Sequence, residues 1–164
     1  MLQADEISAP SGLTIVKQAF GVQMVATRPM PKALLSTDEV ISLTNSDAAE
    51  MLALATLTEP GPFRPRTYAM GHFRGVRIDG RLAAMAGERL RMPGYTEVSG
   101  VCTHPNDRGR GLARRLSAIV AADIEARGET PFLHAWQTNQ PAITLYTSLG
   151  FELRRTMHVA VLTR

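Results

Sequence analysis

The chain has 164 residues, 45% hydrophobic and 20% charged, so one domain with a single core is the simplest expectation. The formal net charge of +3 is too small to indicate a nucleic-acid partner. No stretch approaches the ~20 consecutive apolar residues of a membrane helix, and the N-terminus does not resemble a secretory signal.

The few cysteine and histidine residues limit the chemistry further. Cys102 is the only cysteine, so no disulfide forms within the chain, and a cytoplasmic location is expected. The four histidines are scattered and lack the spacing of zinc ligands, so no metal site is expected.

The first third of the chain predicts one strand region and one helix. Residues 1–12 are small and polar, which is typical of a loose lead-in. Residues 14–28 are β-branched and apolar, and predict one bent strand or a hairpin. Asp47 followed by Glu50 resembles a capping box at the start of a helix, which ends at Pro60.

The middle of the chain predicts a loop followed by antiparallel strands. Residues 59–72 are rich in Pro and Gly and predict a loop with a short helical turn. An Asp79-Gly80 turn signal joins two of the strands that follow. The expected strands are residues 73–78, 82–90 and 97–104.

The last third predicts two helices and three further strands. Apolar residues at helical spacing indicate a helix over residues 112–127, which Gly128 ends. A second helix starts at a Thr138 or Asn139 cap. The expected strands are residues 131–136, 151–155 and 157–162. Together the elements predict a single α/β sandwich with mostly hairpin-linked strands.

Residues 98–116 predict a strand, a basic loop and a helix whose first turn is entered through Gly109 and Gly111. The free N–H groups of a helix start carry partial positive charge, and glycine lets a ligand approach the backbone closely. This pattern indicates a diphosphate cradle; the alternative is that the glycines only shape a turn. A P-loop is excluded because Leu112 follows Gly111, and a dinucleotide fingerprint because Arg114 replaces the required glycine.

The segment Arg108-Gly109-Arg110-Gly111-Leu112-Ala113 resembles the Arg/Gln-x-x-Gly-x-Gly/Ala signature of the GNAT superfamily of N-acetyltransferases. The strand before it and the later Asn139-Gln140-Pro141-Ala142 and Leu149-Gly150-Phe151 segments are also similar, so the likeness covers roughly residues 95–155. It implies one GNAT domain over residues 1–164, with a central mixed, mostly antiparallel sheet that is split between two parallel strands and flanked by helices.

The resemblance also implies acetyl-CoA as the acyl donor. Main-chain groups of Val101 and Thr103 would pair with the pantetheine arm, and Asn139 would contact it. Arg114 and Arg115 either reach the ribose phosphate or lie on a solvated helix face. The diphosphate would lie on the backbone amides of Arg108, Gly109, Arg110, Gly111, Leu112 and Ala113.

Two residues are candidates for proton transfer. Glu97 opens the strand that leads to the cofactor, where the family often places a general base; the alternative is an exposed acid at a strand end. Tyr146 matches the tyrosine that protonates the departing thiolate; the alternative is a core tyrosine. Cys102 alternates with the cofactor-pairing residues and is interpreted as a small buried residue, not a nucleophile.

The expected reaction is transfer of an acetyl group to a primary amine of a small-molecule or amino-acid-like acceptor. Acetylation of a protein N-terminus or lysine and a non-catalytic acyl-CoA sensor are the alternatives, and a homodimer is left open. No nucleic acid or membrane partner is expected. Aromatic and basic side chains are expected to line a site for an acceptor carboxylate. The alternative is that they belong to an ordinary polar loop. These residues are Phe63, Arg64, Arg66, Tyr68 and His72.

Overall fold

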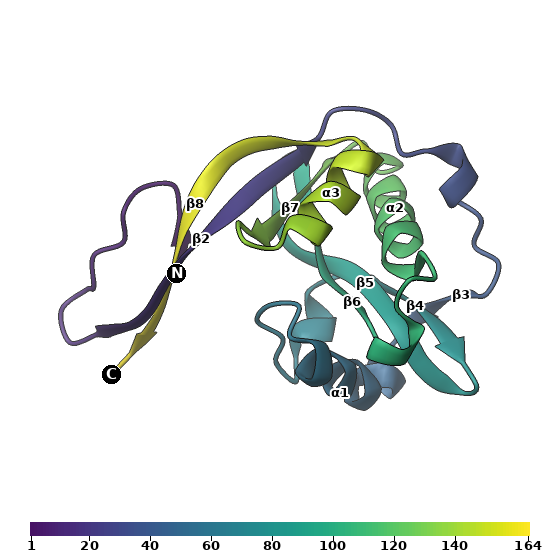
Figure 1. Cartoon of the computed structure of the whole chain (residues 1–164), viewed down its shortest axis with the longest axis horizontal. Coiled ribbons are helices and arrows are strands. Elements are labelled where there is room, and N and C mark those ends of the chain that lie inside the picture. Colours follow the sequence, from purple (N-terminus) through teal and green to yellow (C-terminus); the bar gives the residue numbers. More distant parts are fainter. The chain divides into compact units, whose positions relative to one another are not determined.

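The computed structural model describes all residues 1–164 and groups them into two compact units. Unit 1 comprises residues 1–27 and 132–164, and unit 2 comprises residues 28–131. None of the helices has the length and apolar character needed to cross a membrane. Figure 1 labels the strands and helices along the chain.

Unit 1 is built on antiparallel strands and one helix. Its elements are β1 (Leu2–Gln3), β2 (Thr14–Ala26), β7 (Thr130–Trp136, which begins at the end of unit 2), α3 (Gln140–Leu149) and β8 (Phe151–Thr163). The strands follow the order β1-β8-β2-β7. β2 and β8 pair along almost their whole length and form the long ribbon in Figure 1.

The strand predictions for this unit need one correction. Residues 151–155 and 157–162 are not two strands but one, β8, because pairing continues through Thr156, which lies opposite Val22. Residues 14–28 contain the one strand β2, and a shift of register between Gln23 and Met24 accommodates its irregularity.

The first residues are more ordered than a loose lead-in. Leu2 pairs with Val159 in β8, and the N-terminal ammonium donates to the Ala160 carbonyl at 2.6 Å. Ile7 is buried. The local sequence therefore did not indicate the short edge strand β1, because this strand forms only by pairing with β8.

Unit 2 has four antiparallel strands in the order β6-β5-β4-β3, with helices α1 and α2 packed against β5 and β6 on opposite faces (Figure 1). Its strands are β3 (Val40–Leu43), β4 (Phe73–Ile78), β5 (Arg81–Met92) and β6 (Tyr95–Thr103). Its helices are α1 (Ala48–Thr58), α2 (Leu112–Glu125) and the short 3-10 turns η1 (Lys32–Leu34), η2 (Asn45–Asp47), η3 (Thr67–Met70) and η4 (Pro105–Asp107). The sequence did not indicate β3, and η3 confirms the turn expected in residues 59–72.

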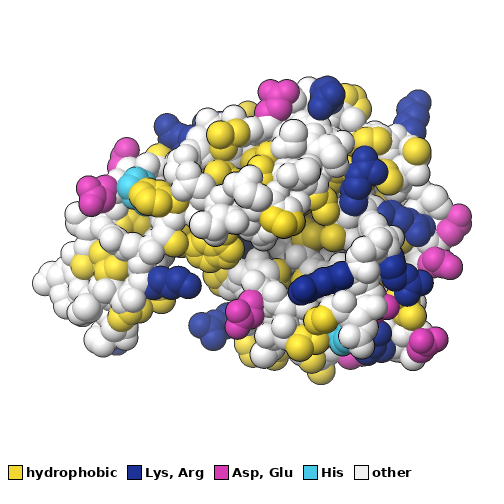
Figure 2. Space-filling model, in the orientation of Figure 1, with side chains coloured by type: hydrophobic (Ala, Val, Ile, Leu, Met, Phe, Trp, Pro, Cys, Tyr) yellow, Lys and Arg dark blue, Asp and Glu magenta, His cyan; other side chains and the backbone are white.

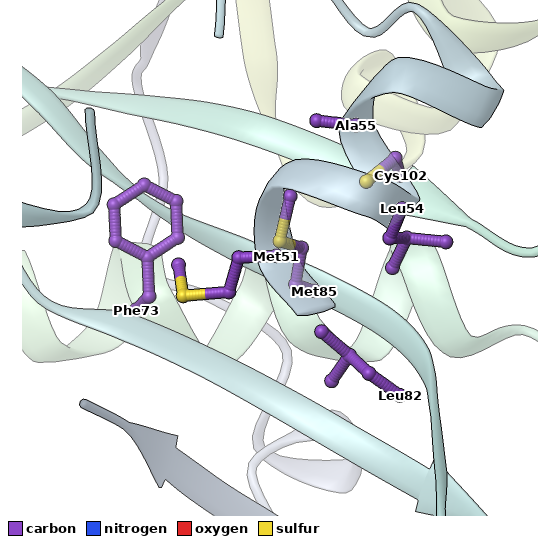
Figure 3. Close-up of a cluster of buried hydrophobic side chains, with 7 residues drawn as sticks. All are labelled: Met51, Leu54, Ala55, Phe73, Leu82, Met85 and Cys102. Atoms are coloured by element: carbon purple, nitrogen blue, oxygen red, sulfur yellow. The ribbon is translucent and has the colours of Figure 1, made fainter. Parts of the chain in front are cut away.

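The core of unit 2 fills the space between α1 and the sheet (Figure 3). Gly87 lies under the ring of Phe73, where an added Cβ would lie 2.3 Å from a ring carbon, so β5 requires glycine at this position. The buried cluster consists of Met51, Leu54, Ala55, Phe73, Leu82, Met85 and Cys102.

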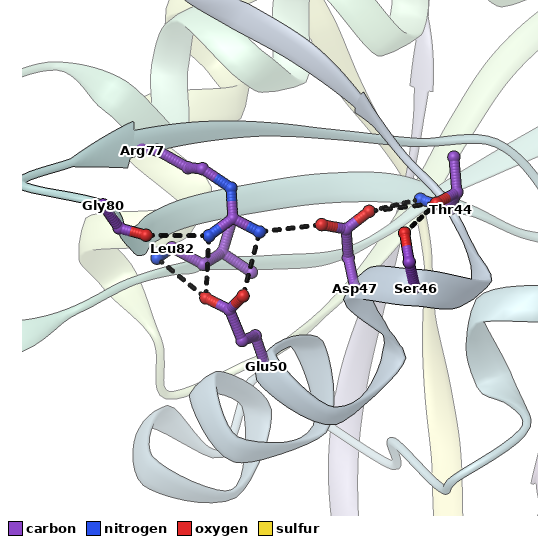
Figure 4. Close-up of polar contacts among 7 residues, drawn as sticks. All are labelled: Thr44, Ser46, Asp47, Glu50, Arg77, Gly80 and Leu82. Carbon is purple, nitrogen blue, oxygen red and sulfur yellow. Dashed lines mark hydrogen bonds and ion pairs between the residues drawn. The ribbon is translucent and has the colours of Figure 1, made fainter.

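The start of α1 is held by an ionic network centred on Arg77 of β4 (Figure 4). The Arg77 guanidinium lies 2.7 Å from Asp47 and 2.9 Å from Glu50. The capping box is formed by Thr44 and Asp47, one turn earlier than the sequence pattern indicated. Glu50 instead binds Arg77 and accepts from the Leu82 N–H, so it joins the helix to the β4–β5 hairpin.

We expect Asp47→Asn to lower the free energy of unfolding by about 1 kcal/mol at pH 7, because a partly exposed charge pair is lost while a capping side chain remains. The Thr44 N–H and Arg77 hold the pKa of Asp47 below its ordinary value. Its contribution is therefore present above the unfolded-state pKa of about 4 and lost as pH falls through the folded-state pKa.

Urea unfolding at pH 7 and pH 2.5 measures this effect, with Asp5→Asn as the control because Asp5 is exposed and outside the network. A difference from wild type that is equally large at both pH values would contradict the electrostatic explanation.

Candidate active site

The loop before α2 forms an open cradle of backbone groups. Gly109 and Gly111 have φ angles of 78° and 75°, in the left-handed region that favours glycine. A Cβ added at either position would meet no atom within 4 Å. Gly111 caps α2 and, having no side chain, does not bond the N–H groups of the first turn. A helix start, open space and glycine fit a diphosphate.

Basic side chains lie beside this cradle but differ in role. Arg110 contacts Asp107 at 3.3 Å, and Arg108 is exposed. Arg115 donates to the backbone carbonyls of Ser36 and Asp38, so it holds the 36–38 segment and is neither free for a ribose phosphate nor simply solvated. On the face drawn in Figure 2, Lys and Arg side chains are spread among acidic ones.

Glu97 of β6 is a buried, fixed carboxylate. Its side chain is 1% exposed. The guanidinium of Arg89 donates to both of its oxygens, from Nε to Oε2 and from Nη2 to Oε1, each at 2.8 Å. The alternative of an exposed acid at a strand end is therefore wrong. The bidentate contact fixes the orientation of the carboxylate.

A second buried glutamate, which the sequence reasoning missed, lies on β5. Glu88 is fully buried and paired with Arg91 and with Arg127, the latter at 2.9 Å. Glu88 and Arg89 are consecutive in one strand, so their side chains project from opposite faces. The signal available in the sequence was a glutamate inside the apolar run 82–90.

The end of β6 carries the groups expected to meet the pantetheine arm. Gly100 has a φ of 62°, which marks a local irregularity of the strand before Val101. Val101 and Thr103 are half-buried, and the Thr103 hydroxyl is buried without a hydrogen-bond partner. Cys102 lies in the core between them, as predicted, and burial raises the pKa of its thiol to about 11.

Asn139 and Tyr146 belong to α3 in unit 1. Asn139 is the cap of that helix, accepting from the Ala142 N–H at 3.2 Å. Tyr146 is buried and packs edge-on against Phe151 with ring centroids 6.1 Å apart. Glu97, Val101 and the loop before α2 belong to consecutive segments of unit 2.

The segment expected to line the acceptor is divided between core and surface. Phe63 and Tyr68 pack against the buried cluster of unit 2, with Phe63 edge-on to Phe73. Arg64 and Arg66 are exposed and form no ion pair in the structure. They therefore present two uncompensated positive charges. No group of three or more His, Cys, Asp or Glu residues is arranged to hold a metal ion.

Comparison with known proteins identifies the family. The model of the FR47-like protein family matches residues 74–159, slightly more than half of the chain. A crystal structure of a GNAT-family protein from Novosphingobium aromaticivorans DSM 12444 is 47% identical with a TM-score of 0.94, and the match covers 100% of this chain and 73% of that one. The chain belongs to the GNAT family of N-acetyltransferases.

Other GNAT proteins are more distant. The N-alpha-acetyltransferase RimI of Mycobacterium tuberculosis (strain H37Rv) is 38% identical over 84 residues, 49% of this chain and 52% of the relative, so the match spans about half of that protein. The ribosomal-protein-S18-alanine N-acetyltransferase of Escherichia coli shares the fold at 20% identity, with a TM-score of 0.61 and coverage of 74% and 92%. The predicted GNAT fold class, a mixed α/β architecture, is confirmed.

Proposed function

We propose that this GNAT chain transfers an acetyl group from acetyl-CoA to a primary amine of a small-molecule or amino-acid-like acceptor, by direct attack in a ternary complex. The observation that carries the proposal is the open, glycine-lined start of α2, the next α-helix in the chain after the strand that bears Glu97. The family uses acetyl-CoA as its donor.

The residues of the cradle bind and orient the donor in this proposal. Backbone N–H groups from Arg108 to Ala113 hold the diphosphate, and Asn139 contacts the pantetheine arm. Acetyl-CoA supplies a thioester whose carbonyl is open to attack. The N–H of Val101 stabilises the negative charge that develops on the carbonyl oxygen.

Glu97 and Tyr146 move the protons. Glu97 takes a proton from the ammonium form of the acceptor, directly or through water, so that a neutral nitrogen attacks the carbonyl carbon. The C–N bond forms, the C–S bond breaks, and Tyr146 gives its proton to the departing thiolate. The nitrogen then loses its second proton, which restores the Tyr146 hydroxyl, and the proton held by Glu97 passes to solvent. Arg89 holds both Glu97 oxygens and keeps the base in position.

The exposed Arg64 and Arg66 support an acceptor that carries a carboxylate, because neither is compensated by an acid. A second candidate is acetylation of a protein N-terminus, which the similarity to the N-alpha-acetyltransferase of M. tuberculosis favours. The two candidate functions differ in the acceptor, which is a small molecule in the first and the N-terminus of a protein in the second.

Thiol release from acetyl-CoA with a panel of amines tests the proposal. The panel contains free amino acids, their amides and peptides with a free N-terminal alanine. We expect turnover of small amines with a carboxylate, and a higher KM for them in Arg64→Gln/Arg66→Gln with unchanged kcat. Turnover of peptides alone would favour the protein acetyltransferase, and coenzyme A binding without turnover of any amine would favour a sensor.

A further inference from the structure

Asp107 is a buried acid placed directly before the diphosphate cradle. Its side chain is 6% exposed and contacts three side chains that carry or can carry positive charge. Arg81 Nη2 lies 2.8 Å from Oδ2, Arg110 Nη1 lies 3.3 Å from Oδ1, and His104 Nδ1 lies 3.9 Å from Oδ2. Its N–H also donates to the His104 carbonyl at 2.9 Å, closing the η4 turn.

The contact between Asp107 and Arg110 is important because few other side-chain contacts fix the conformation of the cradle. Gly109 and Gly111 have no side chains and allow many backbone conformations. Within residues 108–111 the contact between Arg110 and Asp107 is the one side-chain bond in the structure. Arg81 is the first residue of β5, so Asp107 connects Arg110 of the loop to the start of this strand.

The charges are also arranged for an anion. An uncompensated aspartate beside the cradle would repel a diphosphate, but here it is neutralised by Arg81 and Arg110. Its hydrogen bond with Arg81, followed by the charges of Arg81 and Arg110, lowers the pKa of Asp107, so the group remains ionised near neutral pH. The side chain therefore orders the loop without adding net negative charge.

We infer that Asp107 is a positioning residue for coenzyme A: it fixes Arg110 and the loop 108–111 so that their backbone N–H groups point at the diphosphate. The inference rests on the proposed donor and goes beyond it, since it assigns a role to a residue outside the family signature. Asp107 touches no reacting atom, so its effect falls on donor affinity and not on the chemical step.

The test is Asp107→Asn, which keeps the size of the side chain and removes its charge. We expect the Kd of coenzyme A, measured by calorimetry, to rise about tenfold, as for a lost charge-assisted hydrogen bond. In steady-state kinetics KM for acetyl-CoA rises while kcat and KM for the acceptor stay unchanged. Asp123→Asn is the control, because Asp123 pairs with Arg74 on the same unit, away from the loop.

Arg81→Gln provides a second variant, since Arg81 is partly exposed and its loss releases the same anchor from the other side. It is expected to weaken coenzyme A binding in the same way. An unchanged Kd in either folded variant, or an equal loss for donor and acceptor, would overturn the inference. If wild type binds coenzyme A but acetylates nothing, the proposed reaction fails, and calorimetry still decides the role of Asp107.

Discussion

Glu97→Gln is expected to lower kcat for acetyl transfer by about 10²–10⁴, the usual contribution of one acid–base group. Glutamine has nearly the same shape but cannot accept the proton of the amine. The carboxylate is buried and held by its bidentate contact with Arg89, so the proposed base has a fixed position near the start of β6. Coenzyme A affinity is expected to stay unchanged. Stopped-assay kinetics measures kcat, and calorimetry measures the affinity.

Glu88→Gln is the matched control. Glu88 is as buried as Glu97 and is also held by arginine, but it lies on the neighbouring strand with its side chain on the opposite face. Both variants lose a buried ion pair, so both lose stability, whereas only Glu97→Gln loses the base. Equal losses of kcat in the two folded variants would mean that Glu97 has a structural role only.

Gly111→Ala is expected to raise the Kd of coenzyme A by about 10–100-fold, equivalent to the loss of one or two charge-assisted hydrogen bonds. The new methyl group would occupy the open space where the ligand approaches the backbone. Alanine at a φ of 75° also costs about 1 kcal/mol of stability, because its Cβ crowds the backbone in the left-handed region.

Gly128→Ala separates these two effects. Gly128 follows the same helix, α2, at its other end, with a φ of 77° and open space around an added Cβ. Both variants therefore carry the same backbone strain, and only one of them alters the cradle. Thermal unfolding should shift similarly in both, and calorimetry should show weaker binding in Gly111→Ala alone. Equal affinities in the two variants would exclude the loop as the diphosphate site.

Elements that depend on local signals were predictable from the sequence. Gly111 and Gly128 mark the two ends of α2, and Asn139 and Gly150 mark the two ends of α3. These ends were predictable because caps and left-handed glycines act within a few residues. The same locality explains why the open cradle could be expected, since its geometry depends on two glycines and a helix start.

Features that depend on the register of paired strands or on contacts between segments far apart in the chain were not predictable. Arg89 meets Glu97 only through the irregular register of β5 and β6, which shifts between Glu88 and Arg91. Asp107 meets Arg81 across 26 residues of sequence. The continuity of β8 likewise depends on β2, more than 130 residues away at some positions. Such contacts follow from the tertiary fold and leave no periodic pattern in the chain.

The proposed function requires that backbone N–H groups at the start of α2 bind the diphosphate of coenzyme A. Amide chemical shifts in ¹⁵N-labelled protein, followed as coenzyme A is titrated and then as pantetheine is titrated, test it directly. We expect the resonances of Gly109, Gly111, Leu112 and Ala113 to move with coenzyme A and to stay in place with pantetheine, which lacks the diphosphate. A lack of response of these amides to millimolar coenzyme A, or an equal response to pantetheine, would contradict diphosphate binding at the start of α2.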